Sequence, residues 1–526
     1  MTGKLDYLIA NATVVDGSGN EPFAGHVGIR HNKIAVVSRE KITTPARQVI
    51  DAAGRYLTPG FIDTHASTGF GFFFPHAADH KLYQGITTEI FGNCGTSPAP
   101  IGPLLTEKMQ SLAGALGFSF DWQSLAGYYE RLEAIGLQFN VATLTGHSTL
   151  RAGLVKDWQN PQPAELAGMK RAMQQSMGEG ALGLSTGLIY APGCFADTGE
   201  IVELAKIAAT YGGVYASHMR DERDKLEEAI EETLSIGEQA GINVLVSHLK
   251  AAERRNFGKL PAVLARLEAY NRTHTVQAKI DVYPYTAAST KLRAFVPKKL
   301  LAGGIEQVPE RLRQAGVEEE IAGYIKARGY DLNQMLFISN DHPQWEGKTI
   351  AEIAATEGWS LAKTMIELLV RDTEVWIIYF CMDEADMDAA ICWPDAMICT
   401  DSWSHPINAP HRIGIPHPRS YGAFTQFIYD YVKIKKRLTF QEAVRKISSM
   451  PADYFNLYGR GRISEGLIAD LNLIDLEALK PKATYTAPLQ LSEGIAWVWV
   501  NGKAIIEDKV INETKPGVII KNQQVS

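Results

Sequence analysis

The sequence lacks a long basic run and a long apolar run. Its 526 residues contain 52 Lys and Arg against 59 Asp and Glu, which gives a formal net charge of −7. This balance argues against nucleic acid as a partner. No apolar run reaches membrane-spanning length, and the first residues, MTGKLDYLIANATVV, do not follow the charged-then-apolar layout of a signal peptide. We therefore expect a cytoplasmic protein with no nucleic-acid or membrane partner.

Cysteine is also scarce. The chain contains 5 cysteines, an odd number spread over its length, which does not resemble a disulfide framework. Free thiols are usually buried and inert, so we expect a chemical role only where a cysteine has ligand-type neighbours. The five positions are Cys94, Cys194, Cys381, Cys392 and Cys399.

What the sequence does contain is typical of a large globular enzyme. Apolar residues make up 45% and charged residues 21% of the chain, which are ordinary values. The length predicts about two to three domains and is sufficient for a β/α barrel of roughly 250 residues or more. No internal repeat or low-complexity linker divides the chain.

Both ends of the chain alternate like short β-strands. Residues 1–56 contain three such runs separated by turn residues, and the C-terminal end has runs at 470–475, 495–506 and 517–520. The pair Asn501-Gly502 is typical of a tight hairpin. We therefore predict a small β-sandwich built from both termini, residues 1–56 and 462–526.

Eight apolar runs of β type alternate with helical patterns in the middle of the chain. Residues 198–212 and 223–241 are amphipathic, and residues 440–457 resemble closing helices. This alternation predicts an α/β fold, a (β/α)8 TIM-type barrel over residues 57–461. The last crossover is too long for one helix, so we expect an inserted subdomain over the mouth, at about 290–394. The eight runs are Phe61–His65, Thr87–Cys94, Phe139–His147, Ala181–Leu188, Val214–His218, Val244–His248, Val276–Tyr283 and Ala396–Asp401.

Ligand-type side chains stand where several of these runs end. His65 closes the first run, and His218 and His248 close two successive runs one β/α unit apart. Because the carboxyl ends of barrel strands meet at one face, these imidazoles are expected to lie close together. Cys94, in GNCG, adds a thiolate, and Zn²⁺ accepts this mixture of sulfur and nitrogen. For each histidine alone, the competing interpretation is a hydrogen-bonded turn residue.

Asp401 ends the eighth run, AMICTD. A carboxylate at this position would face the metal across the barrel axis. It could then serve as the general base that takes a proton from metal-bound water and passes it to the leaving nitrogen. The competing interpretation is a solvated loop residue or a helix N-cap before Trp403.

Eight motifs spread along nearly the whole chain belong together. They are PGFIDTH (59–65), QGITTEIFGNCG (84–95), GHSTLR (146–151), GALGLSTGLIYAPG (180–193), YASHMRDE (215–222), SHLKAA (247–252), DVYPYTAAST (281–290) and HPRSYGAF (417–424). GNCG together with YASHMRDE and SHLK is a specific combination, whereas FIDTH alone would indicate only a superfamily. On these motifs the chain resembles the amidohydrolase superfamily and, within it, the D-aminoacylase or N-acyl-D-amino-acid deacylase group.

The resemblance implies a role for each ligand-type residue. Cys94, His218 and His248 match the tight zinc site, where the cysteine replaces the carboxylated lysine of many relatives. His65 matches the first histidine of a second, weaker metal position. Asp401 matches the catalytic acid and base.

The resemblance also implies substrate contacts. His147, in GHSTLR, is expected to orient the site and contact substrate rather than bind zinc, and Arg412 competes with Arg419 for its role. Arginine suits a carboxylate because its fork donates two parallel bonds. The residues implied in holding the substrate carboxylate and acyl carbonyl are Lys250, Tyr283, Ser289 and Arg419.

The sequence departs from the family pattern after the first strand. Ser67 stands where a second histidine is usual, and a hydroxyl is a poor zinc ligand beside imidazole. We therefore expect one zinc per chain. The aromatic run Phe70–Phe74 is expected to pack in the core rather than line the mouth. His76 and His80 are expected on a helical surface, with replacement of the missing ligand as the alternative.

Together these observations predict a zinc-dependent hydrolase of a small molecule. The expected substrate is an N-acyl-(D-)amino acid or related N-acyl compound, cleaved at a non-cyclic amide by metal-bound hydroxide. Two alternatives stay open. One is the same site acting on a cyclic amide, a carbamate or a carbon–carbon bond next to a carbonyl, and the other is a barrel that binds a ligand without catalysis. The sequence also leaves a homo-oligomer open.

Overall fold

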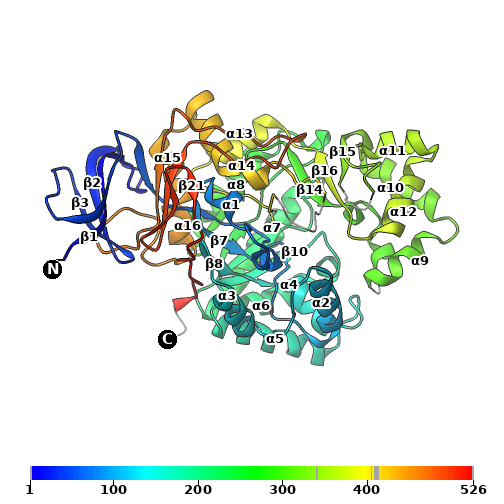
Figure 1. Ribbon diagram of the computed structural model, residues 1–526. Helices are drawn as coiled ribbons and strands as arrows, with labels where there is room; N and C mark the ends of the chain where they lie inside the picture. Colours follow the sequence, from blue (N-terminus) through cyan, green and yellow to red (C-terminus); the bar gives the residue numbers. More distant parts are fainter. Residues whose placement is uncertain (1–2, 303, 339–341, 404–405, 408–413, 524–526) are drawn as a thin grey trace.

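The computed structural model describes residues 3–302, 304–338, 342–403, 406–407 and 414–523. Figure 1 shows the strands of both chain ends together on one side, the alternating strands and helices in the middle, and a helical region of residues from about 290 to 380 on the other side. None of the described helices is long and apolar enough to cross a membrane.

All eight predicted β runs contain strands, and these strands are parallel. They are divided between two sheets, whose strand orders are β6-β7-β8 and β17-β13-β12-β11-β10-β9. Strands β8 and β9 belong to one run, broken at Leu144. The α/β class is therefore confirmed. The strands are β6 (Phe61–Asp63), β7 (Ile86–Phe91), β8 (Asn140–Thr143), β9 (Thr145–Gly146), β10 (Gly183–Gly187), β11 (Val214–His218), β12 (Asn243–Val246), β13 (Ala278–Val282) and β17 (Ala396–Ile398).

Backbone contacts close these strands into a ring, called the strand ring below. Ala66 and Ser402 form a parallel bridge just beyond β6 and β17. The Asp401 N–H donates to the His65 carbonyl at 2.9 Å, and the Ser67 N–H donates to the Ser402 carbonyl at 3.0 Å. The carboxyl ends of the first and last strands are therefore held side by side, and these are the ends that carry His65 and Asp401.

Helices follow the strands as the amphipathic patterns predicted. Helix α6 begins after Asp197, whose side chain accepts a hydrogen bond from the Glu200 N–H. Helix α7 ends at Gly241, which adopts a left-handed φ of 66° that favours glycine. The helices around the ring are α1 (Asp79–Leu82), α2 (Pro103–Ala115), α3 (Leu125–Ile135), α4 (His147–Leu154), α5 (Pro163–Gly178), α6 (Thr198–Thr210), α7 (Leu226–Ala240), α8 (Leu260–Thr273), α13 (Glu384–Cys392), α14 (Arg419–Ile428), α15 (Phe440–Ile447) and α16 (Ser449–Tyr454).

The two chain ends share one nine-stranded sheet, called the end sheet below. The link between its halves is the antiparallel pair of β5 and β18. Asn501 and Gly502 form the turn between β19 and β20 with φ of 47° and 75°, which suits the predicted hairpin. The strands are β1 (Leu5–Val14), β2 (Phe23–Arg30), β3 (Lys33–Ser38), β4 (Ala46–Asp51), β5 (Tyr56–Pro59), β18 (Leu471–Ile474), β19 (Ile495–Val500), β20 (Lys503–Glu507) and β21 (Val510–Ile511).

A separate antiparallel sheet lies within the long crossover between β13 and β17. Its strand order is β14-β16-β15, and its apolar residues pack with the neighbouring helices into a core of their own. Helix α13, by contrast, packs against α8 and β17 and belongs to the strand ring. The exact domain boundaries stay predictions. The elements are β14 (Ala287–Lys291), α9 (Val308–Leu312), α10 (Val317–Arg328), β15 (Met335–Ile338), α11 (Ile350–Glu357), α12 (Leu361–Arg371) and β16 (Trp376–Phe380).

Candidate metal centre

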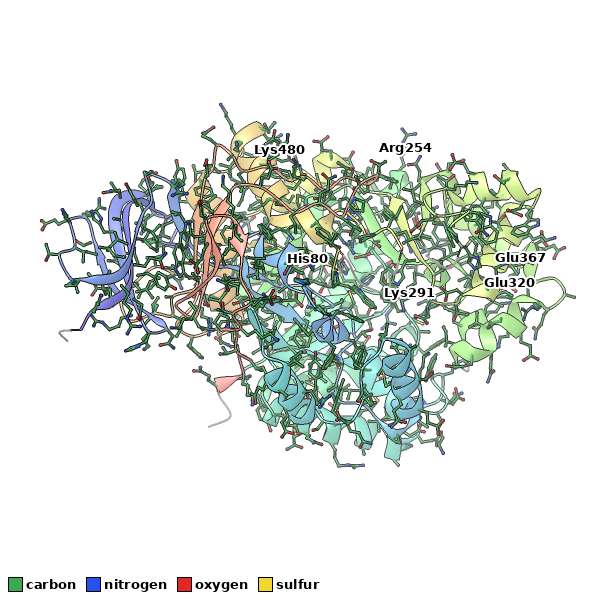
Figure 2. The ribbon with its side chains drawn as sticks, viewed as in Figure 1. His80, Arg254, Lys291, Glu320, Glu367 and Lys480 are labelled. Carbon is green, nitrogen blue, oxygen red and sulfur yellow. The ribbon has the colours of Figure 1, made fainter. Side chains whose placement is uncertain are left out.

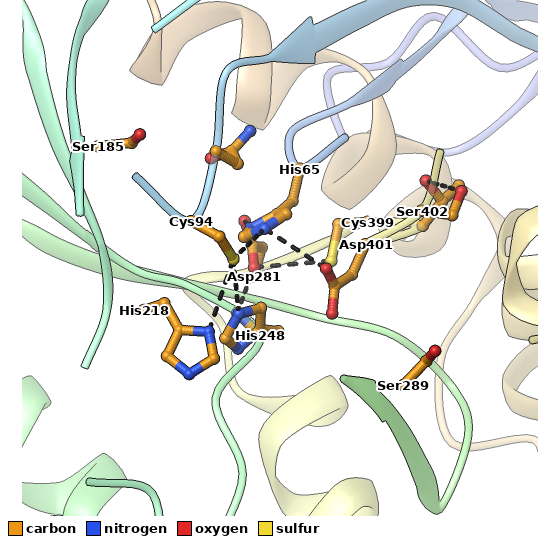
Figure 3. Close-up of polar contacts among 12 residues, drawn as sticks. His65, Cys94, Ser185, His218, His248, Asp281, Ser289, Cys399, Asp401 and Ser402 are labelled. Atoms are coloured by element: carbon orange, nitrogen blue, oxygen red, sulfur yellow. Dashed lines mark hydrogen bonds and ion pairs between the residues drawn. The ribbon is translucent and has the colours of Figure 1, made fainter. Parts of the chain in front are cut away.

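Five ligand-type side chains converge at the carboxyl end of the strand ring. The Cys94 sulfur lies 3.3 Å from His248 Nε2 and 3.5 Å from His218 Nδ1. His65 Nε2 lies 3.2 Å from the same sulfur, and 3.5 Å from Asp401 Oδ1. Figure 3 shows these side chains pointing toward one another from separate strands, with Asp401 facing Cys94 across the cluster. The structure thus brings together the five residues that the sequence singled out for metal chemistry.

The donor set fits a zinc ion. Zinc bound by thiolate at about 2.3 Å and by imidazole at about 2.0–2.1 Å, with tetrahedral angles, separates sulfur from nitrogen by about 3.6 Å. The three sulfur–nitrogen distances here are 3.2, 3.3 and 3.5 Å. Ligand atoms of His65, Cys94, His248 and Asp401 all lie within 4.8 Å of one another. A single ion could therefore contact several of these groups without a rearrangement of the backbone.

The backbone is strained where it presents these groups. Cys94, His248 and Asp401 adopt positive φ values of 51°, 37° and 43°, which cost of order 1–3 kcal/mol each for residues other than glycine. A Cβ on Gly187 would lie 2.2 Å from the Cys94 carbonyl oxygen, so glycine is required for this close approach. Ser185 Oγ accepts the Gly95 N–H at 3.1 Å and holds the GNCG loop.

Charges in the cluster favour a thiolate. Burial opposes ionisation of the Cys94 thiol, but the neighbouring His65 and His248 rings and a hydrogen bond from His218 hold its pKa well below the usual value. Burial favours neutral His65, yet the Cys94 and Asp281 charges raise the pKa of His65 well above its usual value. The thiolate is the form of cysteine that binds metal.

Asp401 and Arg419 form the opposite wall of the site. Arg419 Nη1 lies 2.8 Å from Asp401 Oδ2. The guanidinium also lies 4.5 Å from the centre of the Tyr283 ring, and its Nη2 donates to the Ser289 carbonyl at 3.5 Å. Although burial opposes the charged form, Arg419, His248 and His65 hold the pKa of Asp401 at about 2. Asp401 is therefore a carboxylate at neutral pH.

Lys250 and Glu222 lie behind His218 and His248. Lys250 Nζ is 2.7 Å from both Glu222 Oε1 and His248 Nδ1. Glu222 also reaches His248 Nδ1 at 3.0 Å and His218 Nε2 at 3.6 Å. One carboxylate therefore faces the outer nitrogens of both imidazoles, an arrangement that fixes ring orientation in metal sites.

Sequence reasoning missed Glu222 and Asp281. Asp281 is fully buried, accepts the His248 N–H and lies 3.4 Å from His65 Nδ1. Both acids stand in motifs that carry the family resemblance, because Glu222 ends YASHMRDE and Asp281 begins DVYPYTAAST. Their positions were the available signal, because Asp281 is on strand β13 and Glu222 is four residues after His218.

His147 contacts a different group of side chains. Its Nε2 is 2.8 Å from Glu200 Oε1, which also accepts Arg151 Nε at 2.8 Å. Arg151 in turn donates to the Pro192 carbonyl at 3.1 Å. The structure therefore places His147 beside the loop that carries Tyr190, whose ring centre is 4.9 Å from that of His218.

The segment after His65 is partly buried. The run Phe70–Phe74 packs against aromatic residues such as Phe118 and Trp122. Only Phe72 of this run is buried, and Phe70 and Phe73 are half-buried against the core. The surface prediction for His80, labelled in Figure 2, is wrong, since its ring is buried 4.9 Å from that of Tyr421. His76 is exposed and pairs with Asp79 at 3.2 Å. Arg412 lies outside the described residues.

Comparison with known proteins places this geometry in a family. The model of the amidohydrolase family matches residues 48–277 and 409–506. N-acyl-D-glutamate deacylase of Alcaligenes xylosoxydans xylosoxydans is 34% identical, over 99% of this chain and 97% of the relative. D-aminoacylase of the same organism is 30% identical, over 98% of this chain and 97% of the relative.

A solved structure agrees over the whole length. N-acyl-D-glutamate deacylase of Bordetella bronchiseptica, in complex with zinc and a phosphonate that mimics the tetrahedral intermediate, has a TM-score of 0.84 and 31% identity, and covers 99% of this chain and 100% of its own. Sequence, fold and site point the same way: the chain belongs to the amidohydrolase family and is an enzyme of its D-aminoacylase and N-acyl-D-amino-acid deacylase group.

Proposed function

We propose that the protein is a zinc-dependent hydrolase, built on a (β/α)8 barrel, that cleaves the non-cyclic amide bond of an N-acyl-D-amino acid. The observation that carries this proposal is the convergence of Cys94, His218 and His248 on one point opposite Asp401. Zinc held there would act as a Lewis acid and supply a nucleophile at neutral pH. Because Ser67 replaces a histidine, we propose one zinc per chain.

Asp401 carries the proton. As a carboxylate close to His65, it can accept a proton from the attacking water and then donate it to the leaving nitrogen. Burial raises the pKa of Tyr190, so its hydroxyl stays protonated. This hydroxyl, now bonded to Thr290 Oγ1 at 2.7 Å, is placed to donate a hydrogen bond to the oxyanion that develops on the substrate.

A cationic wall is suited to the substrate carboxylate. Arg419 and Lys250 both lie near the ring of Tyr283, at 4.5 and 5.9 Å from its centre. Arg419 is nearly fully buried, so its charge is poorly screened. A carboxylate beside Arg419 would place the acylated nitrogen of an amino acid near Asp401.

The test is a turnover screen with the zinc-loaded protein. N-acyl amino acids of both hands, cyclic amides and aryl amides are compared, and we expect the D-amino-acid derivatives to be hydrolysed with the highest kcat/KM. Preferred turnover of a cyclic amide, or none with any substrate, would overturn the proposal.

Arg419→Ala should mainly raise KM for carboxylate-bearing substrates. The exposed Arg437, which pairs with Asp388, gives the matched control Arg437→Ala, expected to leave KM unchanged.

A further inference from the structure

A buried charged cluster that the proposed chemistry does not use lies beneath the metal centre. Lys81 Nζ is 2.6 Å from Asp63 Oδ2 and 3.3 Å from Glu89 Oε2. All three residues are 0% exposed. Lys81 comes from the short helix α1, in the segment after Ser67 where the sequence departs from the family pattern. Burying a lysine is costly unless its charge is paired, so these contacts are specific features of this fold.

The Asp63 carboxylate joins the two strand ends that close the ring. It accepts the Thr400 N–H at 2.9 Å and the Thr400 hydroxyl at 2.6 Å. It also accepts the His65 N–H at 3.3 Å. Thr400 directly precedes Asp401, and Asp63 stands two residues before His65. One carboxylate therefore holds the segment that presents the proton carrier and the segment that presents a ligand-type imidazole.

Lys81 contacts both Asp63 and Thr400. Besides its ion pair with Asp63, its ammonium donates to Thr400 Oγ1 at 2.7 Å, and Ser402 Oγ donates to the same oxygen at 3.0 Å. The Thr400 hydroxyl thus accepts two hydrogen bonds and donates its proton to Asp63. Without Lys81, the Asp63 carboxylate would be buried without its counter-charge, and the Thr400–Ser402 turn would lose a donor.

We propose that Lys81 is a positioning residue for catalysis. Through Asp63 and Thr400, its ammonium fixes the strained turn at Asp401 and keeps the carboxylate in line with His65. Only the expected loss of turnover rests on the proposed function, because the position of the Asp401 carboxylate can be determined without a substrate.

A second buried lysine, on α15, contacts the other end of β17 and provides a matched control. Lys446 Nζ donates to the carbonyls of Trp393 and Ala396, at the amino end of β17, and is 4% exposed. Lys81 acts at the carboxyl end of the same strand. In β/α barrels the carboxyl ends carry the chemistry, and the amino ends serve stability.

The experiment compares Lys81→Met with Lys446→Met in the zinc-loaded protein. Both variants should lower Tm. Lys81→Met should reduce kcat roughly 10- to 100-fold, in the range seen for outer-shell partners, with KM and zinc content unchanged. Lys446→Met should keep the kcat of the wild type. A normal kcat in Lys81→Met, or equal losses of kcat in both variants, would overturn the proposal.

A second pair of variants covers the case in which Lys81→Met does not fold. Thr400→Val removes the hydroxyl at nearly constant volume, and Thr400→Ser restores it. We expect a loss of kcat in Thr400→Val and its recovery in Thr400→Ser. Equal activity of these two variants would contradict the proposal.

Crystal structures of the variants test the positioning role of Lys81 independently of the proposed function. If the wild type hydrolyses no N-acyl-D-amino acid, the proposed function fails, but the geometry can still be examined. In Lys81→Met or Thr400→Val, we expect the Asp401 carboxylate to leave its position 3.5 Å from His65 Nε2, whereas in Lys446→Met it should stay. An unmoved Asp401 in the first two variants would overturn the positioning role.

Discussion

Asp401 and Arg419 are joined by an ion pair of 2.8 Å, so the proposed proton carrier and the proposed substrate anchor share one contact. A substrate held by this guanidinium would therefore lie next to the carboxylate that is proposed to transfer the proton. The pair also explains how the half-buried Asp401 carboxylate stays ionised, although burial alone would raise its pKa.

Replacing Asp401 by asparagine should remove proton transfer and leave the metal in place. We expect kcat to fall by roughly 10²–10⁴, the usual contribution of a general base, while elemental analysis gives an unchanged zinc content. Asp395, at the amino end of β17 and paired with Lys279, provides the control Asp395→Asn with normal kcat. Full turnover in Asp401→Asn would show that another group is the base.

Cys94 is expected to be essential for tight metal binding. Cys94→Ser replaces a thiolate by a hydroxyl, which is a poor zinc ligand, so the purified variant should lose its zinc on dialysis. Cys392 is half-buried on α13, and Cys392→Ser should retain the zinc of the wild type. Retention of zinc in Cys94→Ser would mean that the histidines suffice.

Metal stoichiometry tests the consequence of Ser67. Elemental analysis of the wild type should give about one zinc per chain, and Ser67→His should raise the value toward two, because it restores a second imidazole beside His65. The neighbouring Thr68→Val serves as a control that adds no ligand. About two zinc ions in the wild type would show that another residue completes a second site.

Glu222 should tune metal affinity without being part of the tight zinc site. Glu222→Gln keeps the shape of the side chain but removes the charge that faces both His218 and His248. We expect the affinity for zinc, measured by competition with a chelator, to fall roughly 10- to 100-fold. Glu232 lies on α7 and pairs with Arg220, and the control Glu232→Gln should leave the affinity unchanged.

Lys446 should make stability depend on alkaline pH. Burial lowers its pKa from 10.5 to about 8, so between these values the unfolded chain holds a proton that the folded chain has lost. The free energy of unfolding should therefore rise with pH across this window, by about 3 kcal/mol from this residue. Denaturant titrations of the wild type and of Lys446→Met from pH 7.5 to 10.5 measure the difference, since other groups titrate equally in both. Parallel pH profiles would contradict the prediction.

The strands and long helices could be predicted because their signals are local. Apolar runs such as the one ending at His248 and the amphipathic pattern of α7 are visible within a few residues. The positions of Cys94, His218 and Asp401 followed from the rule that strand ends meet at one face. The order of β14, β16 and β15 could not be predicted, because pairing over long distances leaves no local pattern.

The buried charges were the harder part of the site. In the sequence, Lys81 and His80 look like surface residues, since the partners that make their burial acceptable lie on distant segments. Asp63 is separated by 337 positions from its partner Thr400. Glu222 and Asp281 stood in motifs already quoted, but nothing local distinguishes an outer partner of a histidine from an ordinary acid.

The end sheet has a consequence for synthesis on the ribosome. Pro59, in β5, and Asn472, in β18, lie 413 positions apart and are in contact. At elongation rates of about 5–20 residues per second, β18 is synthesised roughly 20–80 s after β5. During that interval the nascent chain presents an open strand edge, and a chaperone that shields this edge would favour the yield of native enzyme.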